Sequence, residues 1–217
     1  MLKVFLSYHH NARKFAGRVK SCLTGLGMDL FLAHEDLEPS TEWQEEILKN
    51  LRKCDVFMPL LTKSFHSSNW TDQETGIAFA SEKFILPLKV SPDPYGFIGK
   101  LQALKVRKEL EETCRKIVQV MASHPVLGDR TRDGVIDAFL RSTSFEESAR
   151  FAAALLKLKP YSTYQLNRIV LGAAKNQQIY GGRRARQAVN ELIRENRPNV
   201  RKRLVREFAK QVASWPW

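Results

Sequence analysis

Short hydrophobic runs alternate with longer amphipathic stretches over the first half of the chain. Four of these runs predict strands, near residues 2–7, 28–32, 55–61 and 84–89. Apolar residues between them recur at helical spacing, as in residues 11–25, and a closing helix is expected near residues 107–122. Pro87, inside the fourth run, suits an edge strand or a bulge. Strands that alternate with helices in this way are typical of an α/β fold with a parallel, doubly wound sheet.

The strand signal stops near residue 125. Residues 124–128 (HPVLG) indicate a break between two parts of the chain. Helical periodicity then predicts five helices, near residues 131–141, 145–158, 162–176, 184–196 and 198–213. The sequence thus predicts two domains, with the sheet in residues 1–124 and an all-helical domain in residues 125–217.

The net charge of +12 comes entirely from the second half of the 217-residue chain. Residues 1–100 carry 12 Lys and Arg against 12 Asp and Glu, whereas residues 101–217 carry 23 against 11. Residues 183–206 alone hold nine Lys and Arg and only two acidic residues. Such a segment could contact nucleic-acid phosphates, an acidic partner or a second copy. A solvated helix face explains it as well, and we slightly prefer that interpretation to any of these contacts.

The sequence lacks the marks of several protein classes. No window of about 18 apolar residues is present, so we expect no membrane span. The chain starts with a strand pattern and not with a signal peptide, which favours the cytoplasm. Cys22, Cys54 and Cys114 form no CxxC pair, so we expect buried thiols and no metal site. Neither a GxGxxG motif nor a Walker A lysine follows the first strand, so no bound cofactor is predicted.

Residues 69–80 are the most informative stretch, because they form a predicted helix soon after the strand at 55–61. Ser68 or Asn69 can cap this helix, and Trp70 and Glu74, four residues apart, share one of its faces. Ligands of open α/β sheets bind at the carboxyl ends of the strands. A carboxylate beside an aromatic ring could there hold a flat ring and stabilise a positive charge. The alternative is a helix-dipole residue with a packing Trp, and local features alone favour that alternative.

Five segments of the first half form a recognisable series. They are VFLSY at residues 4–8, HEDLEPSTEW at 34–43, CDVFMPLLT at 54–62, WTDQE at 70–74 and LPLKV at 86–90. In this order and spacing they resemble the Toll/interleukin-1 receptor (TIR) domain family. There they would be the opening strand, the BB loop with the start of the next helix, the third strand, the W-x3-E segment and the fourth strand. The resemblance implies a flavodoxin-like sheet with flanking helices, and the second half is similar to the helical extension of some bacterial TIR proteins.

In TIR domains that cleave NAD, the W-x3-E segment supplies the catalytic glutamate, which implies this role for Glu74. Cleavage of the bond between nicotinamide and ribose passes through an oxocarbenium-like cation that a carboxylate stabilises. Trp70 is then expected to stack on a base or to shape the pocket. The other expected substrate-binding residues are Ser7, Tyr8 and His9 after the first strand, and Asp36 and Trp43 beside the BB loop.

Two of these positions have further features. His9, His10 and Asn11 stand where the family often has an acidic residue, so the first loop departs from the family pattern. Trp43 opens an amphipathic helix. The simpler interpretation is that its side chain lies on the apolar face of that helix and packs in the protein core.

The resemblance favours a bacterial TIR enzyme with NAD+ as its substrate. It would release nicotinamide and make ADP-ribose, or a cyclic or conjugated form, as a signal in antiphage defence of the Thoeris type. The expected partners are further copies, through TIR–TIR contacts, and a downstream effector reached by the nucleotide signal. One alternative is a non-enzymatic TIR scaffold or adaptor, which would have no need of the Glu74 carboxylate. The other is a nucleic-acid-associated protein that acts through its basic helical half.

Overall fold

The computed structural model describes residues 1–32 and 43–215, apart from the side chain of Trp43. It divides into two compact units, Met1–Val118 and Gln119–Trp217. The division falls within helix α4 (Leu110–Ala122). The domain boundary that the sequence predicts, between residues 124 and 125, lies slightly later, in the turn after this helix.

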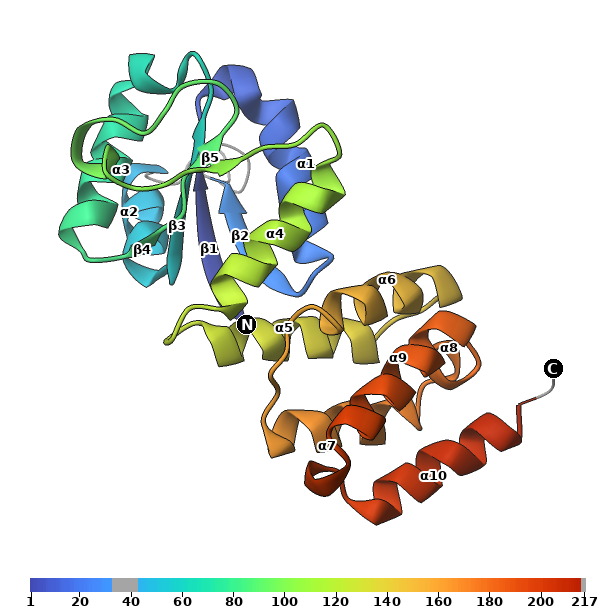
Figure 1. Ribbon diagram of the computed structural model, residues 1–217. Helices are drawn as coiled ribbons and strands as arrows, with labels where there is room; N and C mark the ends of the chain where they lie inside the picture. The colour runs from blue at the N-terminus through green and yellow to red at the C-terminus, as the bar shows by residue number, and fades with distance from the viewer. Residues whose placement is uncertain (33–42, 216–217) are drawn as a thin grey trace. The chain divides into compact units, whose positions relative to one another are not determined.

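A parallel sheet forms the centre of the first unit (Figure 1). Its strands are β1 (Leu2–Ser7), β2 (Met28–Leu32), β3 (Val56–Leu61), β4 (Phe84–Ile85), β5 (Leu88–Lys89) and β6 (Leu104–Lys105). The order across the sheet is β2-β1-β3-β5-β6, with β4 also paired to β3, and every pair is parallel. This confirms the predicted α/β fold with a flavodoxin-like sheet.

Helices cover both faces of this sheet. They are α1 (Arg13–Thr24), α2 (Trp43–Lys53), α3 (Asn69–Ala80) and α4, with short 3-10 turns η1 (His10–Ala12), η2 (Phe65–Ser67) and η3 (Gly96–Ile98). Helices α2 and α3 lie on one face, and α1 and α4 lie on the other (Figure 1). On the α2 side, Phe5 and Phe57 pack against Ile47, Leu51 and Ala78. Every residue of β3 is buried, as expected for a parallel strand covered on both faces.

The predicted strand at residues 84–89 is broken into two pieces. β4 and β5 flank Leu86 and Pro87, and β3 pairs with β4 through its first half and with β5 through its second half. Pro59 lies where β3 changes partner, and it lacks the N–H that a continuous ladder would use. β5 is an interior strand between β3 and β6, so Pro87 marks a break inside the sheet and does not lie at an edge, one of the two placements expected for it. β6 is not among the predicted strands.

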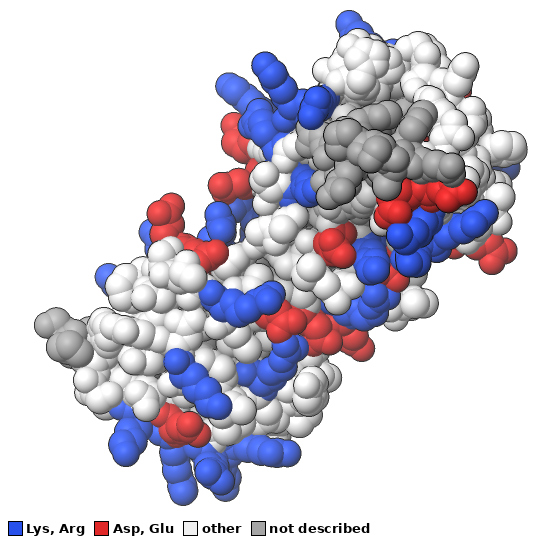
Figure 2. Space-filling model, turned by 180° about the vertical axis from the view of Figure 1, so that it is seen from behind, with Lys and Arg blue, Asp and Glu red and all other residues white. Residues whose placement is uncertain are grey.

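The second unit is helical, as the sequence predicts. Its helices are α5 (Gly128–Leu140), α6 (Phe145–Leu155), α7 (Thr163–Ala173), α8 (Gln177–Tyr180), α9 (Arg183–Glu195) and α10 (Lys202–Ala213), with turn η4 (Arg197–Asn199) before α10. The four-residue α8 is not predicted from the sequence. Phe139, Phe151 and Phe208 are buried in the core of this unit. Residues 119–217 carry 18 Lys and Arg against 8 Asp and Glu, and Figure 2 shows many of these basic side chains at the surface.

Candidate active site

The strand order reverses between β1 and β3. From β1 the chain runs to β2 at one edge and then returns to β3 on the other side of β1. Ligands of open α/β sheets bind at the carboxyl ends of the strands at such a switch point. Ser7 is the last residue of β1, is fully buried, and lies opposite Pro59 of β3. Its hydroxyl is therefore at the position where the fold places a ligand.

Helix α3 turns a mostly polar face toward the sheet. The buried residues on this face follow helical spacing and are Thr71, Glu74, Thr75 and Ala78. Thr71 Oγ1 lies 2.5 Å from the carbonyl oxygen of Phe65 and 2.9 Å from that of Ser68, and it donates to them. These contacts fix the start of α3 to η2. Ser68 is the N-cap residue, but its side chain makes no capping hydrogen bond, so the expected side-chain cap does not form there.

Glu74 and Ser7 meet in this buried layer, although 67 residues separate them in sequence. Ser7 Oγ donates a hydrogen bond of 2.5 Å to Glu74 Oε2. Glu74 is only 3% exposed. The contact holds the carboxyl of α3 over the end of β1, at the switch point of the sheet.

The Glu74 carboxyl group has an unusual electrostatic environment. Burial raises its pKa from 4.5 to about 7, and the hydrogen bond from Ser7 opposes this rise. Its second oxygen, Oε1, is buried and has no hydrogen-bond partner among the described residues. Buried carboxylate oxygens are normally paired, because an unpaired one loses its hydration without compensation. Oε1 can therefore accept a hydrogen bond from a ligand or face a positive charge on it.

Tyr8 and His9 continue the chain beyond Ser7. Tyr8 is buried, with 1% of its surface exposed. His9 is half-buried, and its Nδ1 accepts a hydrogen bond of 3.2 Å from the backbone N–H of Asn11. Its ring lies 4.1 Å from that of His10. Burial and, second, the charge of His10 lower the pKa of His9, so near neutral pH its ring is largely uncharged.

The remaining predicted site residues are placed less fully. Trp70 lies on α3 one turn before Glu74 and is half-buried. Trp43 is the first residue of α2, but its side chain lies outside the described part of the chain, and so does Asp36. The structure thus brings together Ser7 and Glu74, while the catalytic role of Glu74 and the substrate-binding roles of the other six residues stay predictions.

Sequence reasoning missed two features around Glu74. The first is the inward-facing pair Thr71 and Thr75; the latter donates a hydrogen bond of 2.7 Å to the carbonyl oxygen of Thr71. Their i, i+3, i+4 spacing with Glu74 was visible, but polar residues on that face do not suggest burial. The second is Tyr95, whose hydroxyl donates to Asp72 on α3. Burial, followed by this hydrogen bond, raises the pKa of Tyr95. No sequence signal indicates this contact across 23 residues.

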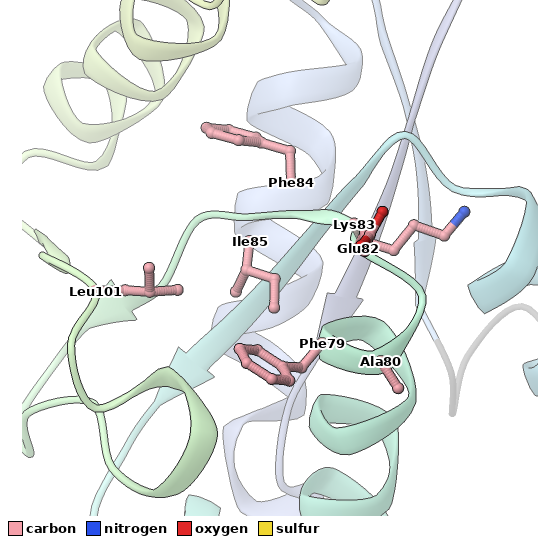
Figure 3. A pocket seen from close by; sticks show the side chains of 7 residues that line it. All are labelled: Phe79, Ala80, Glu82, Lys83, Phe84, Ile85 and Leu101. Atoms are coloured by element: carbon pink, nitrogen blue, oxygen red, sulfur yellow. The ribbon is translucent and has the colours of Figure 1, made fainter.

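A separate pocket of about 610 Å³ lies at the other end of α3. Its lining consists of Phe79, Ala80, Glu82, Lys83, Phe84, Ile85 and Leu101 (Figure 3). Lys83 extends away from Phe79 and Leu101, and its Nζ donates to the carbonyl oxygens of Arg52 and Cys54. The pocket adjoins the short strand β4 and the C-terminal turn of α3, whereas Glu74 faces the carboxyl end of β1. This pocket is therefore not the predicted site.

The described part of the chain contains neither a metal-binding cluster nor a membrane-spanning helix. No group of three or more His, Cys, Asp or Glu side chains in residues 1–32 and 43–215 is arranged to hold a metal ion. Among the helices that the structure describes, none is long and apolar enough to cross a bilayer.

A family model described as "TIR domain" matches residues 4–118, slightly more than half of the chain. The chain belongs to the TIR domain family. The match contains the whole sheet except its first two residues, together with Ser7 and Glu74. The helical unit after residue 118 lies outside it. Comparison with curated proteins gives no match to this chain.

Solved structures similar to this TIR protein match it at low sequence identity and with TM-scores below 0.5. The TIR domain of the Toll-related receptor TRR-2 from Hydra magnipapillata is 17% identical, with a TM-score of 0.44, and the match covers 52% of this chain and 89% of that one. The CMP N-glycosidase BcmB from Clostridium botulinum is 17% identical, with a TM-score of 0.38 and coverage of 53% and 97%. A 2-deoxyribosyltransferase from Leishmania mexicana is 14% identical, with a TM-score of 0.36 and coverage of 48% and 73%.

Proposed function

We propose that the TIR unit is an NAD+ glycohydrolase or cyclase whose catalytic residue is Glu74. The observation that carries the proposal is the Glu74 carboxyl at the switch point, with Oε2 held by Ser7 and Oε1 without a partner among the described residues. A position that served only in packing would not require an ionisable side chain, buried and with one oxygen unpaired. Strongly shifted carboxyl groups at ligand-binding positions are typical of functional sites.

The proposed reaction breaks the bond between C1′ of the ribose and the nicotinamide nitrogen. The bonding electrons leave with nicotinamide, which becomes neutral, and the ribosyl group becomes an oxocarbenium-like cation. Glu74 Oε1 faces this cation and stabilises its developing charge. Attack by water then gives ADP-ribose and releases one proton, whereas attack by a nucleophile of the same molecule gives a cyclic product.

The charge of the substrate supports the ionised form of Glu74. With a pKa of about 7, the carboxyl group of the free protein is partly protonated at neutral pH. The nicotinamide ring of NAD+ carries a positive charge, and a nearby positive charge lowers the pKa of a carboxyl group. Substrate binding would therefore ionise Glu74 at the moment when its negative charge is needed.

Access to the site requires a rearrangement. Ser7, Tyr8 and Glu74 are each at most 3% exposed. A ribose can contact Oε1 only if the groups that cover it move, and such opening steps commonly limit turnover. Trp70, Asp36 and Trp43 are proposed to contact the nicotinamide or adenosine parts of NAD+ in the opened site, with Tyr8 and His9 at its floor.

The wider role that we propose follows from the family. The product acts as a nucleotide signal to a downstream effector in antiphage defence of the Thoeris type, in the cytoplasm. Copies of the chain associate through their TIR units, and one copy's BB loop completes the site of the next. NAD+ is the substrate, and the proposed reaction requires no cofactor.

The test is incubation of the purified protein with NAD+, with the products resolved by mass spectrometry. The parent is expected to release nicotinamide. Glu74→Gln keeps the size of the side chain but removes its charge, and loss of one such transition-state contact typically costs about 100- to 1000-fold in rate. Glu82→Gln makes the same change at an exposed residue just after α3 and is expected to keep the parental rate.

Two outcomes would contradict the proposal. Equal cleavage by Glu74→Gln and Glu82→Gln would exclude Glu74 as the catalytic residue. A parent that cleaves no NAD+ under conditions in which it self-associates would favour the scaffold or adaptor function.

A further inference from the structure

The helical unit contains a pocket of its own, of about 500 Å³, which nothing above explains. It is formed by α9, η4 and α10. Its floor contains the aliphatic side chains Ile193, Val200 and Val205. Four exposed cationic residues complete its lining, together with Asn190; they are Arg194, Arg197, Lys202 and Arg206. A volume of this size is typical of sites for single small molecules.

The four cationic side chains of this pocket are not balanced by ion pairs within the described part of the chain. None of them pairs with a carboxylate among the described residues. The two acidic residues of α9, Glu191 and Glu195, instead pair with Lys159 at 3.2 and 2.6 Å. Like charges gathered around one hollow repel each other, and an anion bound among them removes that repulsion. Figure 2 shows Lys and Arg side chains crowded at the edge of the helical unit.

The charges do not serve the stability of α10. Lys202 and Arg203 open this helix, and its first turn contains no acidic residue and no side-chain cap. Cations at a helix N-terminus oppose the helix dipole, so a solvated face selected for stability would place acidic residues there. Lys202 is therefore placed unfavourably for the stability of α10, whereas Arg194, in the last turn of α9, suits the dipole of its own helix.

The turn that carries two of the cations is held in place from α7. Asn167 Oδ1 accepts a hydrogen bond of 2.9 Å from the backbone N–H of Arg201, and its Nδ2 donates one of 3.1 Å to the carbonyl oxygen of Asn199. These bonds fix the backbone between Arg197 and Lys202. The rim of the pocket is thereby pre-organised, which reduces the entropy lost when a ligand binds.

We propose that this pocket binds a free nucleotide that carries a diphosphate or longer phosphate chain. The guanidinium groups of Arg194, Arg197 and Arg206 suit bidentate contacts with phosphate oxygens, and Lys202 adds a fourth positive charge. The aliphatic floor suits the apolar face of a base, and the amide of Asn190 can pair with its polar edge. The helical unit would then be a nucleotide sensor, whether or not the TIR unit cleaves NAD+.

The lining favours a free nucleotide over a nucleic-acid strand. Proteins that bind single strands without sequence preference stack successive bases on aromatic side chains, and no aromatic residue is among the described residues that line this pocket. A duplex would present its phosphates to exposed cations along a surface and would leave the apolar floor unused.

Calorimetry on the full chain tests the proposal, with ADP as the probe. Arg197→Gln/Lys202→Gln is compared with Lys157→Gln/Lys175→Gln, which removes the same charge from exposed residues elsewhere in the unit. We expect the first pair to weaken ADP binding at least about 10-fold, because charge-assisted contacts to phosphate are lost, and the second pair to leave it unchanged. Circular dichroism checks that all variants are folded. If ADP binds only at the TIR site, neither double variant will differ from the parent in its affinity for ADP.

Three further probes separate the possible ligands. Adenosine is expected to bind far more weakly than ADP, which would support the phosphate contacts. Pyrophosphate that binds as tightly as ADP would overturn the nucleotide assignment, because it carries the same phosphate chain and the base would then contribute nothing. A 20-base-pair DNA duplex that binds more tightly than ADP, through the same two residues, would overturn it in favour of nucleic acid. Equal ADP binding by the two double variants would exclude the pocket altogether.

Discussion

At the scale of single residues, the buried Glu74 carboxyl lowers the stability of the fold at neutral pH. Its pKa is 4.5 in the unfolded chain and about 7 in the folded protein. Below pH 4.5 both states hold the proton, so the group has no effect. Between the two values the unfolded chain releases its proton first, so stability falls as pH rises, and the loss is complete above about pH 7. A shift of this size corresponds to a loss on the order of 3 kcal/mol.

Glu74→Gln is therefore expected to stabilise the protein at high pH. Glutamine keeps a carbonyl oxygen that can accept the hydrogen bond from Ser7, and it carries no charge to desolvate. Thermal melting followed by circular dichroism at pH 5 and pH 8 measures the effect. We expect a higher melting temperature than the parent at pH 8 and a smaller difference at pH 5. A variant less stable than the parent at pH 8 would show that the carboxylate stabilises the fold instead.

Ser7→Ala is expected to shift the pH dependence of NAD+ cleavage. The Ser7 hydroxyl opposes the rise in the pKa of Glu74, so its removal raises that pKa further. Because the ionised carboxylate is the active form, kcat/KM of the parent, which reports the protein without bound NAD+, should rise through a pKa near 7. The midpoint for Ser7→Ala should then lie at higher pH, and the two rates should converge in alkaline buffer. A lower rate with an unchanged midpoint would indicate only a packing role for Ser7.

The candidate site was predictable in part at this scale. Glu74 is singled out by its place in the W-x3-E segment, whereas its local features alone favour a dipole residue. Its near-complete burial could not be foreseen, because the charged residue type indicates exposure. The hydrogen bond from Ser7 depends on the strand order, which places two segments 67 residues apart in contact.

At the scale of elements, the position of Glu74 depends on how α3 begins. Thr71 ties the first turn of the helix to η2 through the carbonyl oxygens of Phe65 and Ser68. Thr71 lies one turn before Glu74 on the same buried face. The polar inner face of α3 thus fixes the helix over the end of β1 through hydrogen bonds. Hydrogen bonds define the orientation of the helix more closely than apolar packing does.

Thr71→Val is expected to lower both stability and activity. Valine has the shape of threonine but cannot donate to the two carbonyl oxygens, and loss of such a buried hydrogen bond costs about 1–3 kcal/mol. Urea unfolding and the NAD+ cleavage rate measure the two effects. Thr24→Val, at the exposed end of α1, is the matched control and should change neither. Parental activity in a destabilised Thr71→Val would show that Glu74 does not depend on this anchor.

The strength of the sequence signal decided which elements could be predicted. β1 and β2 coincide with the predicted strands at 2–7 and 28–32, because apolar residues dominate both segments. β4 and β5 both fall within the predicted strand at 84–89, whereas β6 is a two-residue strand that is too short to produce a period. The same holds for α8, which is a single turn. Short elements are fixed by their neighbours in space and leave little trace in the local sequence.

At the scale of the whole molecule, the two units have different charges and different candidate ligands. Met1–Val118 carries 17 Lys and Arg against 15 Asp and Glu, a net charge of +2. Gln119–Trp217 carries 18 against 8, a net charge of +10. The uneven charge could be read from the sequence, but its concentration around one pocket required the packing of α9 against η4 and α10. The carboxylate proposed to face the positively charged nicotinamide ribose and the basic pocket proposed for a phosphate ligand therefore lie in separate units of one chain.

Self-association should control the activity of the whole molecule. We propose that one copy's BB loop completes the site of its neighbour, and a contact of this head-to-tail kind can repeat into open filaments. The specific rate of NAD+ cleavage should then rise with protein concentration, with little turnover by the dilute monomer. A dilution series with constant NAD+, alongside light scattering to record assembly, measures this. Glu82→Gln should follow the parental curve. A specific rate that stays constant while the assemblies dissociate would show that each copy holds a complete site.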